Sequence, residues 1–543
     1  MFSYFFSGSY GFRDGGYNQY YLFLLVAFGI GVCHVLVCEG KKMNERKAGI
    51  FISYINILFH TLIGFLYVPL LLFYIGRGGY GLYQLIGSFI AYFSIMDFGL
   101  TTTIVRFYAK YKALNDRVGM ENILAISSCG YAVISLIILC IGGICYFCLD
   151  AIFSASMTVA EITEARDLFL LLLFNITATL FGMIFRAVIN AHEKFIFLKG
   201  METVELVIQP VMVVAVLQKY PAAFSVAMVQ TMLNLGLILI RGYYCFHRLK
   251  IKIHFHYWDK NLIYEFKKLA LSVFAISLID QVFFKTNQVI LGIVSGTFAV
   301  AVYSISSLIY MNYMALSNAI SGVYLPHVTE MVTKKEPVEK LSELFIQIGR
   351  WQYFLLALVA TGFIIFGQQF IRLWAGNGFE DAYWITLLII IPFTIDLIQN
   401  LGLCILQAQN KYDFRAKVYF CVGVLNLIMA IPLAVNFGGI GCAFATGLSM
   451  FIGNGLVMNY YYKRVIGLEI VRFWREIGKI SIAICFAFIT GYISNVYFFG
   501  SNSVFHFLGG IASYIFIYSV FVYLFALSAE EKIKLERIFR SST

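Results

Sequence analysis

Residues 123–149 read ILAISSCGYAVISLIILCIGGICYFCL, a stretch without a single charged side chain. A helix needs about 20 mostly apolar residues to cross the hydrocarbon core of a bilayer. The whole chain shares this character, because 60% of its 543 residues are hydrophobic and only 13% are charged. Soluble domains carry about 25% charged residues. The composition therefore excludes a water-soluble protein and predicts an all-α polytopic membrane protein.

Fourteen apolar runs are long enough to form transmembrane helices. We expect spans at 50–75, 82–105, 123–149, 168–190, 200–217, 222–246, 269–291, 298–325, 351–371, 383–406, 417–436, 441–462, 480–499 and 504–527. A further run, Tyr20–Cys38, would add an N-terminal helix before them. Without this run the chain has an even number of spans, so both of its ends lie on the same side of the membrane. The stretch MNERK at 43–47 would then be a short basic start. We therefore expect residues 1–42 to be an N-terminal extension or a misassigned start.

The basic residues predict the orientation of the spans. Alternate connections on one side hold 31 Lys and Arg residues, whereas the others hold only Arg77, Arg166, Lys219 and Arg372. Cytoplasmic loops of membrane proteins are enriched in Lys and Arg. Both ends of the fourteen-helix unit are therefore expected in the cytoplasm. This topology also accounts for the net charge of +11, which leaves nucleic acid without support as a partner.

Two pairs of short motifs indicate an internal repeat. Gly81-Leu82-Tyr83 opens the second run, and Ala301-Val302-Tyr303 opens the eighth. The fourth run ends in INAHEKF at 189–195, and the tenth ends in LQAQNKY at 406–412. The number of residues from position 81 to position 301 is almost the same as the number from position 189 to position 406. Six spans per repeat make the two repeats parallel, and transporters with such halves carry their substrate between them.

The repeat divides the chain into expected domains. These are an N-lobe at 43–246, a cytoplasmic linker at 247–268, a C-lobe at 269–462, and two further spans with a cytoplasmic tail at 463–543.

Ionisable residues inside the spans are the first candidates for function. A charge near the bilayer centre costs roughly 2.5–3.5 kcal/mol on insertion scales, so it needs a partner, a polar cavity or an interfacial position. Asp280 lies deep in the seventh span, about 18 Å from its start at about 1.5 Å per residue. Lys285, Gln281 and Asn287 make this span the most polar one. A lumen-facing cluster and a structural salt bridge or helix–helix hydrogen bond both account for these residues.

Asp97 in the second span is a similar candidate, whereas Arg106 and Arg186 lie near a cytoplasmic end, where snorkelling accommodates long side chains. Cys145 and Cys148 have a redox spacing, but no βαβ pattern surrounds them. We therefore expect no catalytic residue, no metal and no cofactor.

Two amphipathic stretches are expected to anchor the chain at the cytoplasmic interface. Leu341, Leu344, Phe345 and Ile348 follow the spacing of one helix face. The stretch 528–531, SAEE, has the pattern of a capping box and predicts the start of a tail helix.

Several motifs resemble one known family. AGIFISY at 48–54, VPLLL at 68–72, YGLY at 80–83 and MDFGL at 96–100 are similar to the N-terminal lobe of bacterial polysaccharide flippases. YSI at 303–305, LP at 325–326, FIRLW at 370–374 and QAQNK at 407–411 resemble the second lobe. These flippases are Wzx-like members of the multidrug/oligosaccharidyl-lipid/polysaccharide superfamily, and the resemblance runs from Arg46 to the end of the chain.

The resemblance implies a MATE-like fold with a V-shaped cavity that opens alternately to the two sides of a bacterial inner membrane. The substrate would be an undecaprenyl-diphosphate-linked oligosaccharide that moves from the inner to the outer leaflet for surface polysaccharide biosynthesis. Membrane lipids and the polysaccharide assembly machinery are the other expected partners.

The same resemblance gives the polar residues expected roles. Arg106, Arg186 and Lys285 are candidates for binding the diphosphate, and Gln281 and Asn287 for binding the sugar. Asp97 and Asp280 could carry coupling protons or sodium ions, because burial raises the pKa of a carboxyl and attracts cations.

Three other interpretations remain. A cation-coupled multidrug exporter of the same superfamily would favour acidic groups, and the first span contains no Asp or Glu. A lipid II flippase has the same fourteen spans, so the sequence does not separate it from the leading interpretation. A membrane-embedded enzyme such as a polysaccharide polymerase needs a sizeable external loop with catalytic groups, which this chain lacks. We therefore expect a transporter and not an enzyme.

Overall fold

The computed structural model describes residues 45–258, 260–498, 504–529 and 531–533. Every regular element in these ranges is a helix, and no strand occurs among them. The prediction of an all-α protein is therefore confirmed. The expected N-terminal extension, with its run Tyr20–Cys38, lies outside the described residues.

The first part of the chain forms long helices joined by short turns. In chain order they are α2 (Glu45–Ser94), the 3-10 turn η2 (Ile95–Asp97), α3 (Leu100–Ala113), α4 (Arg117–Phe153), α5 (Val159–Ala191), α6 (Phe195–Leu217), α7 (Ala223–Tyr243) and the π-helical turn η3 (Tyr244–Arg248). The long helix α8 (Lys260–Thr333) follows.

The second part of the chain also consists of long helices joined by short turns. It contains α9 (Val338–Trp374), α10 (Asp381–Leu397), α11 (Leu401–Ala408), α12 (Tyr412–Met450), η4 (Phe451–Val457), α13 (Met458–Tyr461), η5 (Tyr462–Ile466), α14 (Ile470–Phe498), α15 (Val504–Phe521) and η6 (Val522–Ala526).

Ten helices among the described residues are long and apolar enough to cross a membrane, or eleven when the bent pair α10 and α11 counts as one span. Three long helices also contain a glycine with non-helical backbone angles, namely Gly76 in α2, Gly296 in α8 and Gly438 in α12. If the 50 residues of α2 formed one straight helix, it would be about 75 Å long at about 1.5 Å per residue. That length exceeds twice the hydrocarbon core of about 30 Å. The number of fourteen spans stays a prediction.

Unusual backbone conformations recur along the chain at the intervals that the motifs indicated. Gly76 (φ 68°) is as far from Gly296 (φ 80°) as Gly81 is from Ala301, and Asn115 (φ 55°) is equally far from Lys335 (φ 53°). The second interval, from position 189 to position 406, also separates Glu193 (φ 58°) from Asn410 (φ 59°) and Lys250 (φ 52°) from Gly467 (φ 86°). Positive φ is uncommon outside glycine, so these four pairs support the internal repeat. Three of the pairs lie outside the motifs, and the pair Glu193 and Asn410 lies within them.

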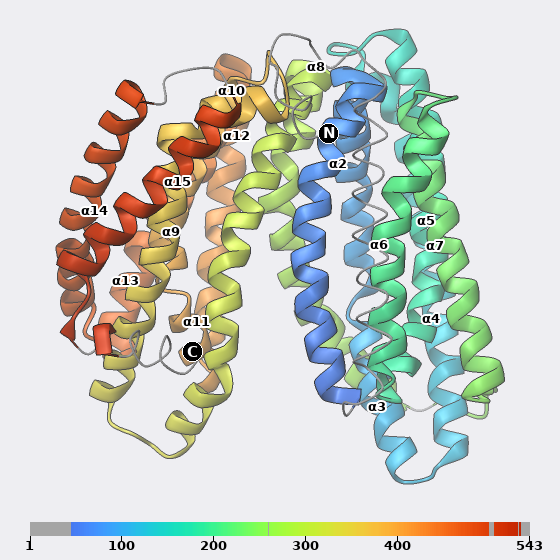
Figure 1. Ribbon diagram of the computed structural model, residues 1–543. Helices are drawn as coiled ribbons and strands as arrows, with labels where there is room; N and C mark the ends of the chain where they lie inside the picture. The colour runs from blue at the N-terminus through green and yellow to red at the C-terminus, as the bar shows by residue number, and fades with distance from the viewer. Residues whose placement is uncertain (1–44, 259, 499–503, 530, 534–543) are drawn as a thin grey trace. The chain divides into compact units, whose positions relative to one another are not determined.

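Contacts divide the described chain into two compact units, one ending at Ser304 and the other beginning at Ile305. The division falls inside α8, so residues 260–304 pack with the helices that precede them; the expected lobe boundaries stay a prediction. In the first unit α5 packs against α4 and α7, and α2 packs against α6 (Figure 1). In the second unit α10 packs against α9 and α12, and α14 packs against α15 and α9 (Figure 1).

Many large apolar side chains face outward, as expected for a surface in contact with lipid. Phe147 on α4 is 78% exposed, and its neighbours Leu136 and Ile144 are also exposed. Soluble monomers rarely expose large contiguous apolar areas. The membrane assignment is therefore supported by the tertiary structure as well as by composition.

One expected membrane anchor is wrong. Leu341, Phe345 and Ile348 are buried in the first turns of α9. The Phe345 ring packs 4.8 Å from the ring of Phe473 on α14. The apolar stripe therefore faces a neighbouring helix and not lipid. It belongs to the first turns of α9, which continues without a break to Trp374.

The second amphipathic stretch behaves as predicted at its capping box. Ser528 N donates to Glu531 Oε2 at 2.8 Å, and Glu531 N donates to Ser528 Oγ at 3.3 Å. Both reciprocal hydrogen bonds of a capping box are therefore present at the start of the tail helix.

Candidate functional site

A polar cavity of about 300 Å³ lies inside the first unit, between α2, α5, α7 and α8. Its polar lining consists of Tyr83, Gln84, Ser94, Asn175, Thr179, Gln230 and Lys285. Glycine and aliphatic side chains complete the wall, among them Gly87, Ile90 and Leu172. Amide, hydroxyl and ammonium groups from four helices therefore converge within otherwise apolar segments.

Hydrogen bonds between helices fix the orientation of the cavity wall. Tyr83 Oη donates to Gln230 Oε1 at 2.6 Å, which joins α2 to α7. Asn234 Nδ2 lies 2.6 Å from both Asn175 Oδ1 and Thr179 Oγ1, which joins α7 to α5. Asn175 and Thr179 are four positions apart, so both face the same side of α5. The wall is therefore preorganised, with its side chains held before any ligand binds.

Lys285 is the charged residue among those lining the cavity. Its side chain is half-buried, and within the described residues it forms no ion pair and no hydrogen bond. An ionised group inside a membrane segment normally has a partner or faces a water-filled cavity. The geometry at Lys285 satisfies the second condition, so its ammonium is available to an anionic ligand.

The other polar residues near Lys285 on α8 do not line this cavity. Asn287 is 1% exposed, and its Nδ2 donates to Tyr303 Oη at 2.9 Å. Gln281 is half-buried, and its Oε1 has no hydrogen-bond partner among the described residues. Asp280 is half-buried, and its carboxylate has a hydrogen-bonding or electrostatic partner. Of the candidates on this helix, the structure brings Lys285 to the cavity.

Asp97 lies at a break between helices. Phe98 (φ 49°) and Gly99 (φ 67°) adopt left-handed conformations that end η2 before α3 begins. The half-buried carboxylate accepts hydrogen bonds at Oδ1 from Tyr131 Oη at 2.7 Å and from Thr101 Oγ1 at 3.0 Å. Asp97 is therefore held by two hydroxyl groups and does not line the Lys285 cavity.

The two candidate arginines differ in their partners. Arg186 pairs with Glu202 at 2.8 Å, and Glu202 also pairs with Lys199 at 2.9 Å. Arg106 is exposed midway along α3, and among the described residues it forms no ion pair. Arg106 and not Arg186 therefore keeps an uncompensated charge.

The family described as "Polysaccharide biosynthesis protein" matches residues 47–332, which is more than half of the chain. The chain belongs to this family. The resemblance to Wzx-like flippases of the multidrug/oligosaccharidyl-lipid/polysaccharide superfamily is thereby confirmed, and the matched range contains the whole polar cavity.

Two curated relatives are described as transport proteins. A Shigella flexneri protein described as an O-antigen transporter is 21% identical over 407 residues, covering 72% of this chain and 91% of that protein. A low-salt glycan biosynthesis flippase of Haloferax volcanii is 28% identical over 151 residues, covering 27% of this chain and 31% of that protein. These descriptions fit the expectation of a transporter.

Solved structures share the fold of this polysaccharide biosynthesis family member. The lipid II flippase MurJ in an inward closed conformation gives a TM-score of 0.69 at 18% identity, over 88% of this chain and 98% of that chain. An inward-facing multidrug resistance MATE family transporter gives a TM-score of 0.57 at 12% identity, over 77% of this chain and 99% of that chain. The predicted MATE-like fold is therefore confirmed.

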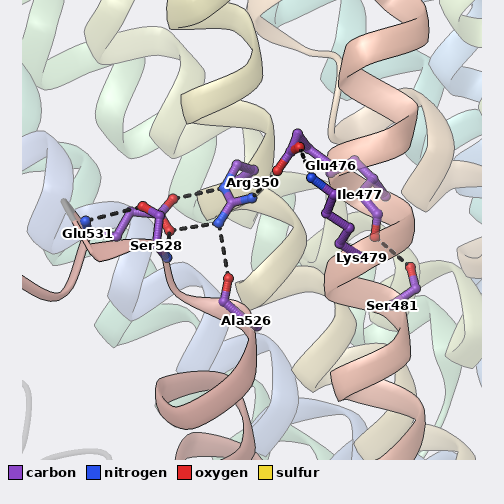
Figure 2. A network of polar contacts seen from close by, with 8 residues as sticks. All are labelled: Arg350, Glu476, Ile477, Lys479, Ser481, Ala526, Ser528 and Glu531. Carbon is purple, nitrogen blue, oxygen red and sulfur yellow. Dashed lines mark hydrogen bonds and ion pairs between the residues drawn. The ribbon is translucent and has the colours of Figure 1, made fainter.

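Two buried arginines of this family member escape sequence reasoning. Arg350, which lies in the connection between the expected spans 298–325 and 351–371, is 8% exposed and donates from Nε and Nη2 to Glu531 at 2.9 and 2.7 Å. Figure 2 shows that it also reaches Glu476 and the carbonyl oxygen of Ala526. Arg415, which lies in the connection between the expected spans 383–406 and 417–436, is 8% exposed and lies 3.4 Å from Asp396. Both arginines are structural, because carboxylate partners neutralise them inside the second unit.

The cavity wall itself was also missed. Asn175, Thr179 and Gln230 are polar residues within apolar segments, and Asn175 with Thr179 has the four-residue spacing of one helix face. That spacing is the signal that could have revealed them. Within the described ranges, no group of three His, Cys, Asp or Glu side chains could hold a metal ion.

Proposed function

We propose that this protein is a flippase that moves an undecaprenyl-diphosphate-linked oligosaccharide from the inner to the outer leaflet of a bacterial inner membrane. The observation that carries the proposal is the polar cavity in an apolar helical bundle. Its wall contains Lys285, which has no ion-pair partner in the described part of the chain. The names of the two curated relatives support a glycan as the cargo.

The physical task of such a protein is to shield polar groups. A sugar hydroxyl without a hydrogen-bond partner is costly in an apolar environment, and the hydrocarbon core is about 30 Å thick. Amide and hydroxyl groups such as Asn175, Thr179 and Gln230 replace the water that the glycan loses. The isoprenoid tail needs no such shielding and stays in the bilayer. The two repeats would rock about the substrate to give alternating access.

Arg106 is proposed as the first contact for the diphosphate. Guanidinium groups bind phosphate oxygens in a bidentate manner. Arg106 is exposed on α3, the helix whose last turn carries Lys110 and Lys112. Arg186 contributes less, because Glu202 already compensates its charge. Asp97 and Asp280 are proposed as carriers of a coupling proton or sodium ion.

The two alternative transporters are separated by their cargo. A multidrug exporter for cationic compounds needs a negatively charged cavity, whereas the charged residue of the described cavity is a lysine. A lipid II flippase shares the fold, but it would be needed for cell-wall synthesis and not for a surface polysaccharide.

Deletion of the gene followed by lipid extraction tests the proposal. The expected result is loss of surface polysaccharide and accumulation of a lipid-linked glycan on the cytoplasmic side, both reversed by the wild-type chain. Accumulation of lipid II would favour the alternative flippase. Normal surface polysaccharide together with increased drug sensitivity would favour the exporter.

A further inference from the structure

The size of the cavity limits what it can hold. Small-molecule sites in proteins measure about 300–1,000 Å³, and this cavity, at about 300 Å³, lies at the lower end of that range. One sugar ring fits such a volume better than a complete oligosaccharide. The wall at Lys285 is therefore expected to bind a single sugar of the glycan.

The charge of the cavity distinguishes between the anionic groups of a lipid-linked glycan. A diphosphate carries about two negative charges and is bound best by guanidinium forks. The described lining contains no arginine and one lysine. A single ammonium group matches a single carboxylate in charge, so the cavity suits an acidic sugar better than the diphosphate.

The amide groups add hydrogen-bond donors beside the ammonium. Asn175 Oδ1 accepts from Asn234, and Gln230 Oε1 accepts from Tyr83. Each amide oxygen is thus engaged, while no described residue accepts a hydrogen bond from Asn175 Nδ2 or Gln230 Nε2. Two oriented NH₂ groups and an ammonium are suited to bind the oxygen atoms of a sugar acid.

We propose that the carried glycan contains an acidic sugar whose carboxylate pairs with Lys285 while its hydroxyl oxygens accept hydrogen bonds from Asn175 and Gln230. This inference rests on the proposed function and specifies the substrate class of the same site. The unpaired lysine is tolerated in the free protein because the cavity is polar, and it gains its counter-charge when the substrate binds.

The experiment compares two lipids in proteoliposomes that contain the full-length chain. Both are undecaprenyl-diphosphate disaccharides, one ending in glucuronic acid and the other in glucose. Flipping is measured as the fraction of glycan that becomes accessible to a glycosidase outside the vesicles. The wild-type chain needs no substitution for this comparison, so the result does not depend on whether a variant folds. Lys285→Gln, Lys285→Arg and the exposed-site control Lys335→Gln are then measured with both lipids.

We expect the wild-type chain to flip the glucuronic acid lipid at least tenfold faster than the glucose lipid. Lys285→Gln should remove this preference by slowing the acidic lipid alone, Lys285→Arg should retain part of it, and Lys335→Gln should retain all of it. Equal wild-type rates for the two lipids would overturn the inference while supporting the proposed function. Equal slowing of both lipids by Lys285→Gln would also overturn it, because Lys285 would then bind the shared diphosphate. Failure to flip either lipid would contradict the proposed function and the inference with it.

Discussion

Arg350 on α9 binds the carboxylate of Glu531, far along the chain, through two hydrogen bonds of 2.9 and 2.7 Å. The same carboxylate accepts a hydrogen bond from the backbone of Ser528 in the capping box. Glu531 therefore starts the tail helix and ties it to α9. The exposed fractions of the two side chains are 10% and 7%, so the pair is shielded from water.

Removing one partner of this pair should destabilise the protein. Loss of one member of a buried ion pair typically costs about 3–5 kcal/mol when the other charge stays without compensation. Here the expected cost is smaller, because Glu476 remains 3.0 Å from Arg350. We expect Glu531→Ala to lower the thermal unfolding temperature that is measured in detergent. Glu469→Ala, which removes the exposed partner of Arg472, is the matched control and should have a small effect, since exposed pairs contribute about 0–1 kcal/mol. Equal effects of the two substitutions would contradict the structural role of Glu531.

The ionisation of the Glu531 carboxylate should make the stability of the protein depend on pH. Burial raises the pKa of Glu531, but hydrogen bonds from Arg350 and from the Ser528 backbone outweigh burial and hold the pKa below the usual value of 4.5. A lowered pKa means that the pair stabilises the folded chain at neutral pH and that this contribution is lost as the pH falls through the folded pKa. We expect wild-type stability to decline more steeply than that of Glu531→Gln below about pH 4.3. Parallel stability profiles for the two proteins would argue against this linkage.

Close packing of α2 against α8 depends on Gly81. A Cβ atom at this position would lie 1.8 Å from the backbone carbonyl oxygen of Thr297. A backbone atom cannot rotate away, so Gly81→Ala should force the helices apart and destabilise the first unit by about 1–3 kcal/mol or more. Gly87→Ala is the control on the same helix, because no atom lies within 4 Å of its added Cβ. Thermal unfolding measures the difference, and a fully stable Gly81→Ala protein would exclude this packing.

Asn122 holds the segment that precedes α8. Its Oδ1 accepts from the backbone N–H groups of His256 and Tyr257 at 3.0 and 3.2 Å, and its Nδ2 donates to the Tyr257 carbonyl oxygen at 2.9 Å. We expect Asn122→Ala to speed hydrogen exchange at residues 256 and 257, because both amides lose their acceptor. Asn122→Asp keeps the acceptor oxygen and should protect these amides more than alanine does. Unchanged exchange in Asn122→Ala would show that the segment is held by other contacts.

The candidate cations should differ in their effect on transport. Lys285→Ala and Arg106→Ala should each abolish surface polysaccharide in a complementation assay, because both remove an unpaired charge from the proposed path. Arg186→Ala should reduce it only slightly, since Glu202 already neutralises that arginine. Membrane levels of each variant serve as the control for expression. Normal polysaccharide with both Lys285→Ala and Arg106→Ala would rule out the proposed cationic path.

Local properties of the chain made the helices, the capping box and the repeat predictable. Ser528 and Glu531 of the capping box are close neighbours in the chain, and the turns at Glu193 and Asn410 lie within the motifs from which the repeat was inferred. Contacts between distant residues were not predictable in the same way. Arg350 was counted as a loop cation because its partner Glu531 lies far along the chain. A basic residue near a helix end has the same sequence signature whether it faces water or a buried carboxylate.

The sequence by itself determined that this is an α-helical membrane protein and predicted two related halves, because hydrophobic length and motif spacing are properties of the chain that need no tertiary contacts. It also determined which polar residues lie inside the apolar segments. Only the tertiary structure decided their roles: Asn287 bonds to Tyr303 inside α8, Arg415 is neutralised by Asp396, and Lys285 lines a cavity whose wall comes from three other helices. The physical reason is that a charge acquires its role from its neighbours in space, and helix packing selects those neighbours from segments far apart in the chain.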